Sequence, residues 1–329
     1  MENSSIILSG NGNKDFSKLV CEHLNKQLFD CDISKFANGE INININNSVR
    51  RKNCYVIQST ALSEFNSPND NLMELFILID ALRRGSANEI NIIIPYYAYS
   101  RQDRKDYKRA PISAAIISNI LQTLNVNRII VYDLHAGQIG GFFPNNIPLD
   151  NLYVEPYFIK HIKTLGYKID DIVIVAPDEG ATKRAVRIAS KLKCQCASIY
   201  KERKVANKVE NMALFGSVEN KIAILVDDII DTAGTACLAA KTLKDYKAKK
   251  VFMYACHGLL SNCALKRINK SNFEKVIITN TVFLNQEKKN CEKIEVIDVT
   301  KLCAEVIKRI EKGNSLSDLY EQEEPIYSI

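Results

Sequence analysis

Residues 224–235 read I-L-V-D-D-I-I-D-T-A-G-T, and this stretch decides the fold class. An apolar run over residues 222–226 ends in two adjacent carboxylates, Asp227 and Asp228. Small and polar residues form a short turn, after which Ala and Leu recur at helical spacing as far as Leu243. The turn consists of Asp231, Thr232, Ala233, Gly234 and Thr235. Strand, turn and helix in this order predict one unit of an α/β fold with a parallel sheet.

The chemistry of this stretch points to a sugar phosphate. A turn of small residues that opens a helix presents unpaired backbone N–H groups and the positive end of the helix dipole, and phosphate binds there. The hydroxyl groups of Thr232 and Thr235 can add donors. Asp227 and Asp228 cannot bind phosphate themselves, but they can accept hydrogen bonds from sugar hydroxyls or hold Mg²⁺ indirectly. The alternative is an ordinary strand–turn–helix corner with a solvated pair of carboxylates.

Length and composition bound the remaining possibilities. A chain of 329 residues with 46% apolar and 25% charged residues suits two globular domains of ordinary size. The net charge of +6 is spread along the chain, which favours small anionic substrates over nucleic acid. The ten cysteines include no C-x-x-C pair, and we find no signal-peptide pattern and no apolar run long enough for a membrane span. We therefore expect a cytoplasmic protein with no membrane partner and with reduced thiols, of which Cys54, Cys256 and Cys303 lie in apolar runs and should be buried.

Apolar runs of strand length alternate with helical patterns through both halves of the chain. Strands are predicted over residues 5–8, 54–57, 90–94, 129–132, 172–175, 197–200, 222–226, 251–254, 276–278 and 294–297. Helices are predicted after a cap at Asp70, from Pro111, and over residues 181–192 and 235–247. These strands predict buried parallel sheets, with a boundary in the Pro- and Asn-rich residues 144–151. Isoleucine and asparagine alternate over residues 41–46, which predicts a half-exposed hairpin or flap.

Ligands of open parallel sheets bind beyond the carboxyl ends of the strands, so the segments after the strands are the ones to inspect. Residues 95–109 hold five cations, including Arg101. A basic loop at this edge suits a polyphosphate, although a solvated surface loop has the same composition. Asp133 and His135 follow the next strand, where they can meet a Mg²⁺–nucleotide or form a structural hydrogen bond.

Three other segments carry polar residues that suit a nucleotide or a phosphate. Residues 176–184 form a second loop into a helix, which predicts a second phosphate site. Lys201 and Arg203 can neutralise a transferring phosphoryl group, although an exposed charged turn looks the same. Residues 36–40 combine an aromatic ring, an amide and a carboxylate, which can stack on adenine and read its amino edge.

Taken together, these segments resemble the ribose-phosphate pyrophosphokinases (PRPP synthetases), class I-like, from about Ile6 to Leu319. Residues 224–235 are also similar to the PRPP-binding motif of type I phosphoribosyltransferases, but those enzymes give no reason for the segments 36–40 and 101–109. The resemblance implies two tandem phosphoribosyltransferase-type (type I) domains, each a mainly parallel sheet flanked by helices, over residues 1–150 and 151–313. It also implies a β flap in the N-terminal half and a tail over residues 314–329.

The resemblance further implies a reaction and a set of site residues. Ribose 5-phosphate and ATP would give PRPP and AMP with Mg²⁺, and Lys201 and Arg203 would be the catalytic-loop cations. The ATP-binding residues would be Phe36, Asn38, Glu40, Arg101, Gln102, Asp106 and His135. Ribose 5-phosphate would be bound by Asp227, Asp228, Asp231, Thr232, Ala233, Gly234 and Thr235. The pyrophosphate loop would be Asp178, Glu179, Gly180 and Ala181, and the metal residues Asp133, His135 and Asp178.

Assembly and regulation follow from the same resemblance. It implies a homo-oligomer, often a hexamer, whose adenine site is shared between subunits, with phosphate and ADP as effectors. Arg50, Arg109 and Ser315 match regulatory positions. The chain departs from the family at Ala181, where the family has a second glycine. It departs again after Phe143, where F-F-P-N-N-I-P replaces F-F-D-I-P and removes a carboxylate.

Two other interpretations compete with this one. The first is a phosphoribosyltransferase that consumes PRPP. The second is a non-catalytic regulatory subunit associated with PRPP synthetase, which lesions in residues 201–204 would reveal; that K-E-R-K segment is intact.

Overall fold

The computed structural model describes residues 5–202 and 211–321, which form two compact units. The first unit contains the chain up to Tyr153 together with Thr281–Phe283 and Thr300–Ser315. The second contains Val154–Asn280, Leu284–Val299 and the residues from Leu316 on. The predicted domains of residues 1–150 and 151–313 stay a prediction, because the two units are interleaved along the chain.

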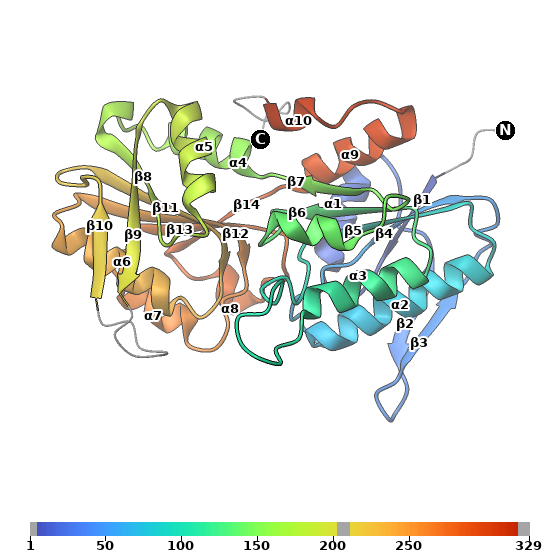
Figure 1. The fold of residues 1–329 in the computed structure, drawn as a ribbon. Coiled ribbons are helices and arrows are strands. Elements are labelled where there is room, and N and C mark those ends of the chain that lie inside the picture. The colour runs from blue at the N-terminus through green and yellow to red at the C-terminus, as the bar shows by residue number, and fades with distance from the viewer. Residues whose placement is uncertain (1–4, 203–210, 322–329) are drawn as a thin grey trace. The chain divides into compact units, whose positions relative to one another are not determined.

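The first unit is built on a parallel sheet of five strands in the order β1-β4-β5-β6-β7. The strands are β1 (Ser5–Ser9), β4 (Asn53–Ile57), β5 (Glu89–Ile94), β6 (Arg128–Tyr132) and β7 (Leu149–Leu152). The helices are α1 (Lys14–His23), α2 (Pro68–Arg84), α3 (Ser113–Thr123) and α9 (Thr300–Lys312), with the 3₁₀ turn η1 (Gly137–Phe142). Figure 1 shows α1 and α9 on one face of this sheet and α2 and α3 on the other. Helices on both faces bury the sheet, which is why its strands are almost continuously apolar.

The flap is a separate antiparallel pair, β2 (Cys31–Lys35) and β3 (Ile41–Ile45). Its isoleucines are half-buried and its asparagines exposed, as the alternation predicted, and β3 packs beside α2. Figure 1 shows the hairpin projecting beyond α2.

The second unit is built on a seven-stranded sheet in the order β10-β9-β8-β11-β12-β13-β14. The strands are β8 (Ile172–Ala176), β9 (Gln195–Glu202), β10 (Asn211–Phe215), β11 (Ile222–Ile230), β12 (Lys250–Gly258), β13 (Lys275–Thr279) and β14 (Ile294–Ile297). The helices are α4 (Glu155–Thr164), α5 (Thr182–Leu192), α6 (Gly234–Asp245), α7 (Ala264–Lys270), α8 (Gln286–Lys289) and α10 (Asp318–Glu321), with the 3₁₀ turn η2 (Ile169–Asp171). All neighbours pair in parallel except β9 and β10.

The predicted fold class, α/β with mainly parallel sheets flanked by helices and a hairpin in the N-terminal half, is confirmed. Strand β11 is longer than predicted, because it runs through the acidic pair to Ile230 while pairing with β12. Strand β7 lies in the segment predicted as a linker; its L-D-N-L sequence shows no apolar run because it forms the edge of the sheet. The cap of α2 is Ser67 and not Asp70, which instead completes the capping box.

Two expectations from composition can also be compared with the structure. The cysteines expected to be buried, Cys54, Cys256 and Cys303, are each fully inaccessible. Within residues 5–202 and 211–321, no helix is both long enough and apolar enough to cross a bilayer.

Candidate active site

The central feature of the second unit is a reversal of strand order between β8 and β11. From β8 the chain continues to β9 on one side, and β11 is then added on the other side of β8. Such a topological switch point leaves a crevice at the carboxyl ends of the two strands, and ligands of open α/β sheets bind there. The loop after β8 leads into α5 and the loop after β11 leads into α6, so both helices present their N-terminal ends at this edge.

The loop after β11 is held in a demanding conformation. Ala233, the residue that precedes α6, has a left-handed backbone with φ of 58°, and no side chain caps the helix. The guanidinium of Arg267 donates a hydrogen bond to the carbonyl oxygen of Thr232 at 2.8 Å. Thr232 and Thr235 are exposed beside the buried Ala233. The predicted phosphate loop therefore has the geometry its sequence suggested: a tight turn, an uncapped helix start and accessible hydroxyl groups.

Three carboxylates lie together at the switch point. Asp227 and Asp228 follow the fully buried residues 222–226 of β11, and the Asp228 N–H donates to the Asp227 carboxylate at 2.9 Å. Asp178 lies beside them, three residues beyond the last position at which β8 pairs with β11. Burial raises the pKa of Asp227 well above its usual value, and the negative charges of Asp228 and Asp178 raise it further. A site that concentrates negative charge in this way suits sugar hydroxyls and a cation.

The loop after β8 shows how the chain tolerates Ala181 in place of glycine. Ala181 precedes α5 with an ordinary helical backbone, φ of −83°, so no glycine is required there. Its methyl group is buried, and its N–H donates to the Asp178 carboxylate at 3.3 Å. Glu179 and Gly180 are exposed at the tip of the loop. Alanine therefore fits this position of the loop without backbone strain.

In the first unit, the loops after β5 and β6 meet at the same sheet edge, because these strands are parallel neighbours. Arg101 and Gln102 are exposed, and the Gln102 carbonyl accepts from the N–H of Ala114 at the start of α3. Asp103 accepts a hydrogen bond from the Gln138 side chain, which ties the two loops together. The remaining predicted ATP residue of this loop, Asp106, is exposed and paired with Arg104 at 3.0 Å.

The two predicted metal residues of the first unit differ in accessibility. His135 is exposed, whereas Asp133 is fully buried with a left-handed backbone, φ of 38°. Asp133 is therefore not available as a surface ligand in this conformation, and its metal role stays a prediction. In the described ranges, no group of three or more His, Cys, Asp or Glu side chains could hold a metal by itself. Mg²⁺ is commonly held by one or two carboxylates plus substrate phosphates, so this arrangement does not oppose it.

The predicted adenine-binding residues lie together at the tip of the flap. The Phe36 N–H donates to the Glu40 carbonyl at 2.8 Å, and the Asn38 side chain accepts from the Glu40 N–H at 3.2 Å. Gly39, with φ of 91°, allows the tight turn. All of these residues are exposed, including 54% of Phe36. An exposed aromatic ring at a hairpin tip suits a site completed by another surface.

Other predicted residues are spread over the two units. Arg203 lies outside the described residues, and of Lys201 only the backbone is described, within β9. Arg50, Arg109 and Ser315 are exposed, and the Ser315 carbonyl accepts from Arg309 at 2.7 Å. None of these positions is tested as a regulatory site.

Comparisons with known proteins agree over nearly the whole chain. Residues 5–124 match the N-terminal domain of ribose phosphate pyrophosphokinase, and residues 204–321 match a phosphoribosyl synthetase-associated domain. Ribose-phosphate pyrophosphokinase 2 of Schizosaccharomyces pombe is 45% identical over 97% of this chain and 98% of its own length. The chain belongs to the ribose-phosphate pyrophosphokinase family. Ribose-phosphate pyrophosphokinase A of Dictyostelium discoideum is 42% identical over 95% of this chain and 97% of its own length.

A solved structure of the same family supports the fold. The phosphoribosylpyrophosphate synthetase of Mycobacterium smegmatis superposes with a TM-score of 0.87 and 34% identity, covering 94% of this chain and all of that one. The resemblance stated from the sequence is thus confirmed at the level of family and fold.

Sequence reasoning missed several residues that shape these sites. Arg267 lies on α7, far from the phosphate loop in sequence, and no local pattern marks it. Gly10 and Gly12 were also missed: a Cβ at Gly10 would lie 2.2 Å from the Gln58 side chain, and one at Gly12 1.9 Å from the Ser59 carbonyl. The S-G-N-G run after β1 was the available signal, because closely spaced glycines indicate a close backbone approach.

Proposed function

We propose that this member of the family is a catalytic ribose-phosphate diphosphokinase that acts in the cytoplasm. In this reaction the C1 hydroxyl of ribose 5-phosphate attacks the β-phosphorus of Mg²⁺–ATP in line. A new bond forms between the C1 oxygen and the β-phosphorus, the bond to the α-phosphate oxygen breaks, and AMP leaves as PRPP is formed. The observation that carries the proposal is the switch point between β8 and β11, where two helix N-termini flank three carboxylates.

The second unit supplies the ribose 5-phosphate side in this proposal. The 5-phosphate binds the N–H groups at the start of α6 and the hydroxyls of Thr232 and Thr235. Asp227 and Asp228 accept hydrogen bonds from the ribose hydroxyls. The pyrophosphoryl group binds at the loop after β8, at Gly180 and the start of α5. These assignments rest on chemistry: backbone N–H groups and hydroxyls donate hydrogen bonds to phosphate oxygens, and carboxylates accept them from sugar hydroxyls.

Mg²⁺ fits the carboxylates at this site. Burial raises the pKa of Asp227, and the negative charges of Asp228 and Asp178 raise it further; a cation would offset these charges. Carboxylate oxygens are the ligands that Mg²⁺ prefers. When bound, Mg²⁺ neutralises charge on the phosphate oxygens. In this proposal Asp178 is the metal residue of the second unit, and Asp133 and His135 are the metal residues of the first.

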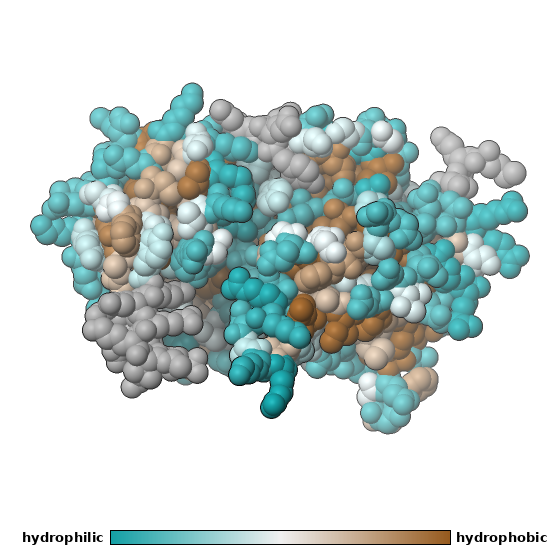
Figure 2. Space-filling view, viewed as in Figure 1, coloured by the Kyte–Doolittle hydropathy of each residue, from teal (hydrophilic) through white to brown (hydrophobic). Residues whose placement is uncertain are grey.

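The first unit supplies the ATP side. Arg101 and Gln102 bind the nucleotide from the loop after β5, and the flap residues Phe36, Asn38 and Glu40 bind the adenine of a neighbouring subunit. The exposed apolar side chains of this unit support assembly into a homo-oligomer, for which we propose a hexamer. Figure 2 shows an apolar area over α2 and α3, where Met73 and Ile116 are each 52% exposed. Phosphate and ADP are the effectors we expect.

A ³¹P NMR time course with purified protein, Mg²⁺, ATP and ribose 5-phosphate tests the proposal, with and without added inorganic phosphate. Simultaneous appearance of AMP and PRPP would support transfer from the β-phosphorus. Release of ADP instead of AMP would contradict it. Binding of both substrates by calorimetry, without turnover in either condition, would favour a regulatory subunit. A dependence of the rate on added phosphate would support the effector site.

A further inference from the structure

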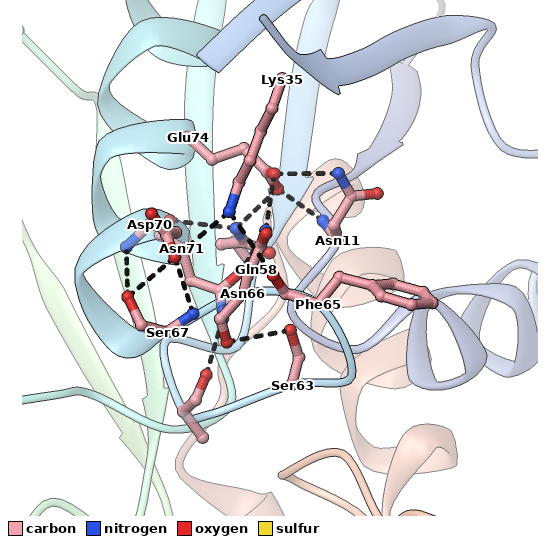
Figure 3. Close-up of polar contacts among 11 residues, drawn as sticks. Asn11, Lys35, Gln58, Ser63, Phe65, Asn66, Ser67, Asp70, Asn71 and Glu74 are labelled. Carbon is pink, nitrogen blue, oxygen red and sulfur yellow. Dashed lines mark hydrogen bonds and ion pairs between the residues drawn. The ribbon is translucent and has the colours of Figure 1, made fainter. Parts of the chain in front are cut away.

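Glu74 is a buried carboxylate in the first unit that no part of the proposed reaction uses. It projects inward from α2 and is 1% exposed. One carboxylate oxygen accepts from the Asn11 N–H at 2.5 Å and from the Gln58 side-chain amide at 2.9 Å. The other accepts from the side-chain amides of Asn11 at 2.9 Å and Asn66 at 3.1 Å. Figure 3 shows this carboxylate among its amide partners.

The partners of Glu74 come from two loops, the one after β1 and the one that connects β4 to α2. Asn11 follows β1, Gln58 follows β4, and Asn66 precedes α2. In the described part of the chain all of these partners are amide groups, so four N–H donors converge on one charge with no cation between them. Each buried N–H left without an acceptor would cost about 1–3 kcal/mol. The carboxylate therefore joins the loop after β1 to both ends of the connection between β4 and α2.

The flap depends on polar contacts at its base. A two-stranded hairpin alone is at best marginally stable in water. The Asn11 side-chain amide donates to the Ile33 carbonyl of β2 at 3.4 Å. Lys35, the last residue of β2, donates to the Phe65 carbonyl at 3.4 Å and pairs with Asp70 at 3.3 Å. These contacts, drawn in part in Figure 3, fix the strand that leads directly into the flap tip.

Two of these flap contacts lead back to Glu74. Asn11 contacts Ile33 with the same side-chain amide that Glu74 holds. The Phe65 carbonyl that Lys35 contacts belongs to the residue before Asn66, whose side chain Glu74 also holds. The carboxylate therefore sets the position of the two groups that contact β2: the side-chain amide of Asn11, which donates to Ile33, and the carbonyl of Phe65, which accepts from Lys35.

We propose that Glu74 is a positioning residue for the flap, which fixes the direction of Phe36 and thereby the affinity for ATP. The inference rests on the proposed function, because Phe36 acquires its role from the adenine site proposed above. Glu74 touches neither substrate. It acts through Asn11 and Asn66 on β2, and through β2 on the residue that follows Lys35.

Steady-state kinetics of Glu74→Gln test the proposal. The glutamine keeps the size but replaces one acceptor oxygen with an N–H₂ group, so two of the four donors lose their partner. We expect the KM for ATP to rise about tenfold, with kcat at saturating ATP and the KM for ribose 5-phosphate each within about twofold of wild type. Amide hydrogen exchange over residues 31–45 should become faster while exchange in α3 stays unchanged.

Glu155→Gln is the matched control, because Glu155 is another buried carboxylate, 3% exposed, paired with Arg187 in the second unit at 3.0 Å. It should lower the melting temperature without changing the KM for ATP. An equal change in both KM values for Glu74→Gln, or an unchanged flap exchange rate, would overturn the proposal.

Lys35→Met keeps the proposal testable even if Glu74→Gln does not fold, because Lys35 is a solvent-exposed contact of the same flap. It should raise the KM for ATP and speed exchange over residues 31–45. In the double variant the two increases should be less than multiplicative, because both act through β2. If the two increases in the KM for ATP multiply fully, Glu74 and Lys35 do not both act through β2. A wild-type protein that forms no PRPP would refute the proposed function, whereas the exchange data would still decide whether Glu74 controls the flap.

Discussion

Arg267 donates a hydrogen bond to the carbonyl oxygen of Thr232 at 2.8 Å, and the next residue, Ala233, has a φ of 58°. A left-handed backbone at a residue with a Cβ costs about 1–2 kcal/mol, so it persists only where neighbouring contacts hold it. The contact from α7 thus stabilises the turn that aims the N–H groups of α6 toward the proposed phosphate.

We expect Arg267→Gln to weaken ribose 5-phosphate binding about tenfold, because the turn loses its charged donor. Ala233→Gly in the same background should restore most of the affinity, because glycine adopts the left-handed conformation without strain. Isothermal titration of each variant with ribose 5-phosphate measures both effects.

Lys266→Gln removes the same charge from an adjacent, exposed position of α7 and serves as the control for Arg267→Gln. It should bind ribose 5-phosphate within about twofold of wild type. Equal weakening by both substitutions would mean that Arg267 acts only through long-range charge. Failure of Ala233→Gly to restore binding would show that Arg267 does not act by stabilising the left-handed backbone at Ala233.

Asp227→Asn should stabilise the folded protein near neutral pH while abolishing turnover. Burial, with the charges of Asp228 and Asp178, raises the folded-state pKa of Asp227 above its ordinary value of 3.8. The folded protein therefore holds a proton that the unfolded chain releases, and this group lowers stability as pH rises from about 4 through the folded pKa. The asparagine removes that penalty, which we expect to be about 1 kcal/mol at pH 8.

Thermal melts in EDTA between about pH 4 and pH 8 test this prediction. The melting temperature of Asp227→Asn should exceed that of wild type most at pH 8 and approach it near pH 4. Asp171→Asn, at an exposed carboxylate, should show no such trend. A gain that is equal at all pH values would assign the effect to packing instead of charge.

Much of the fold was predictable because its sheets are parallel and buried. Strand β5 and the first half of β11 are mainly apolar, and the residues that follow these apolar runs include the proposed site residues, so the same pattern predicts both the strands and the candidate site. The flap was predictable for the opposite reason: its alternation of Ile and Asn reflects one half-buried and one exposed face.

The features of the fold and of the candidate site that could not be predicted depend on contacts between residues distant in sequence. Glu74 lies in an ordinary amphipathic helix, and only the folded chain brings Asn11 and Gln58 to it. The Arg267–Thr232 contact likewise joins α7 to a loop 35 residues earlier. The edge strand β7 escaped prediction because half-buried polar residues carry no periodic signal. Long-range polar contacts and sheet edges leave little trace in local sequence.

Lys201→Met should lower kcat by about 100-fold or more with both KM values nearly unchanged, if its charge acts mainly on the transition state. Steady-state kinetics with varied ATP and ribose 5-phosphate measure the split. Lys168→Met, at an exposed lysine that precedes β8, is the control and should retain wild-type kinetics. Weaker substrate binding with unchanged turnover would instead make Lys201 a ground-state contact.

Ala181→Gly would restore the glycine of the family pattern, yet we expect it to lower stability and leave the kinetics unchanged. Ala181 has an ordinary backbone with φ of −83°, so the conformational freedom of glycine is not required at this position. Its methyl group is buried, so the substitution removes packing contacts of that group. The free energy of unfolding should fall by about 1 kcal/mol, measured by urea denaturation. The KM for ATP and kcat should stay within about twofold of wild type, because alanine adopts the backbone conformation of this loop without strain. A fivefold or greater rise in kcat would instead show that the methyl group restricts the pyrophosphate loop.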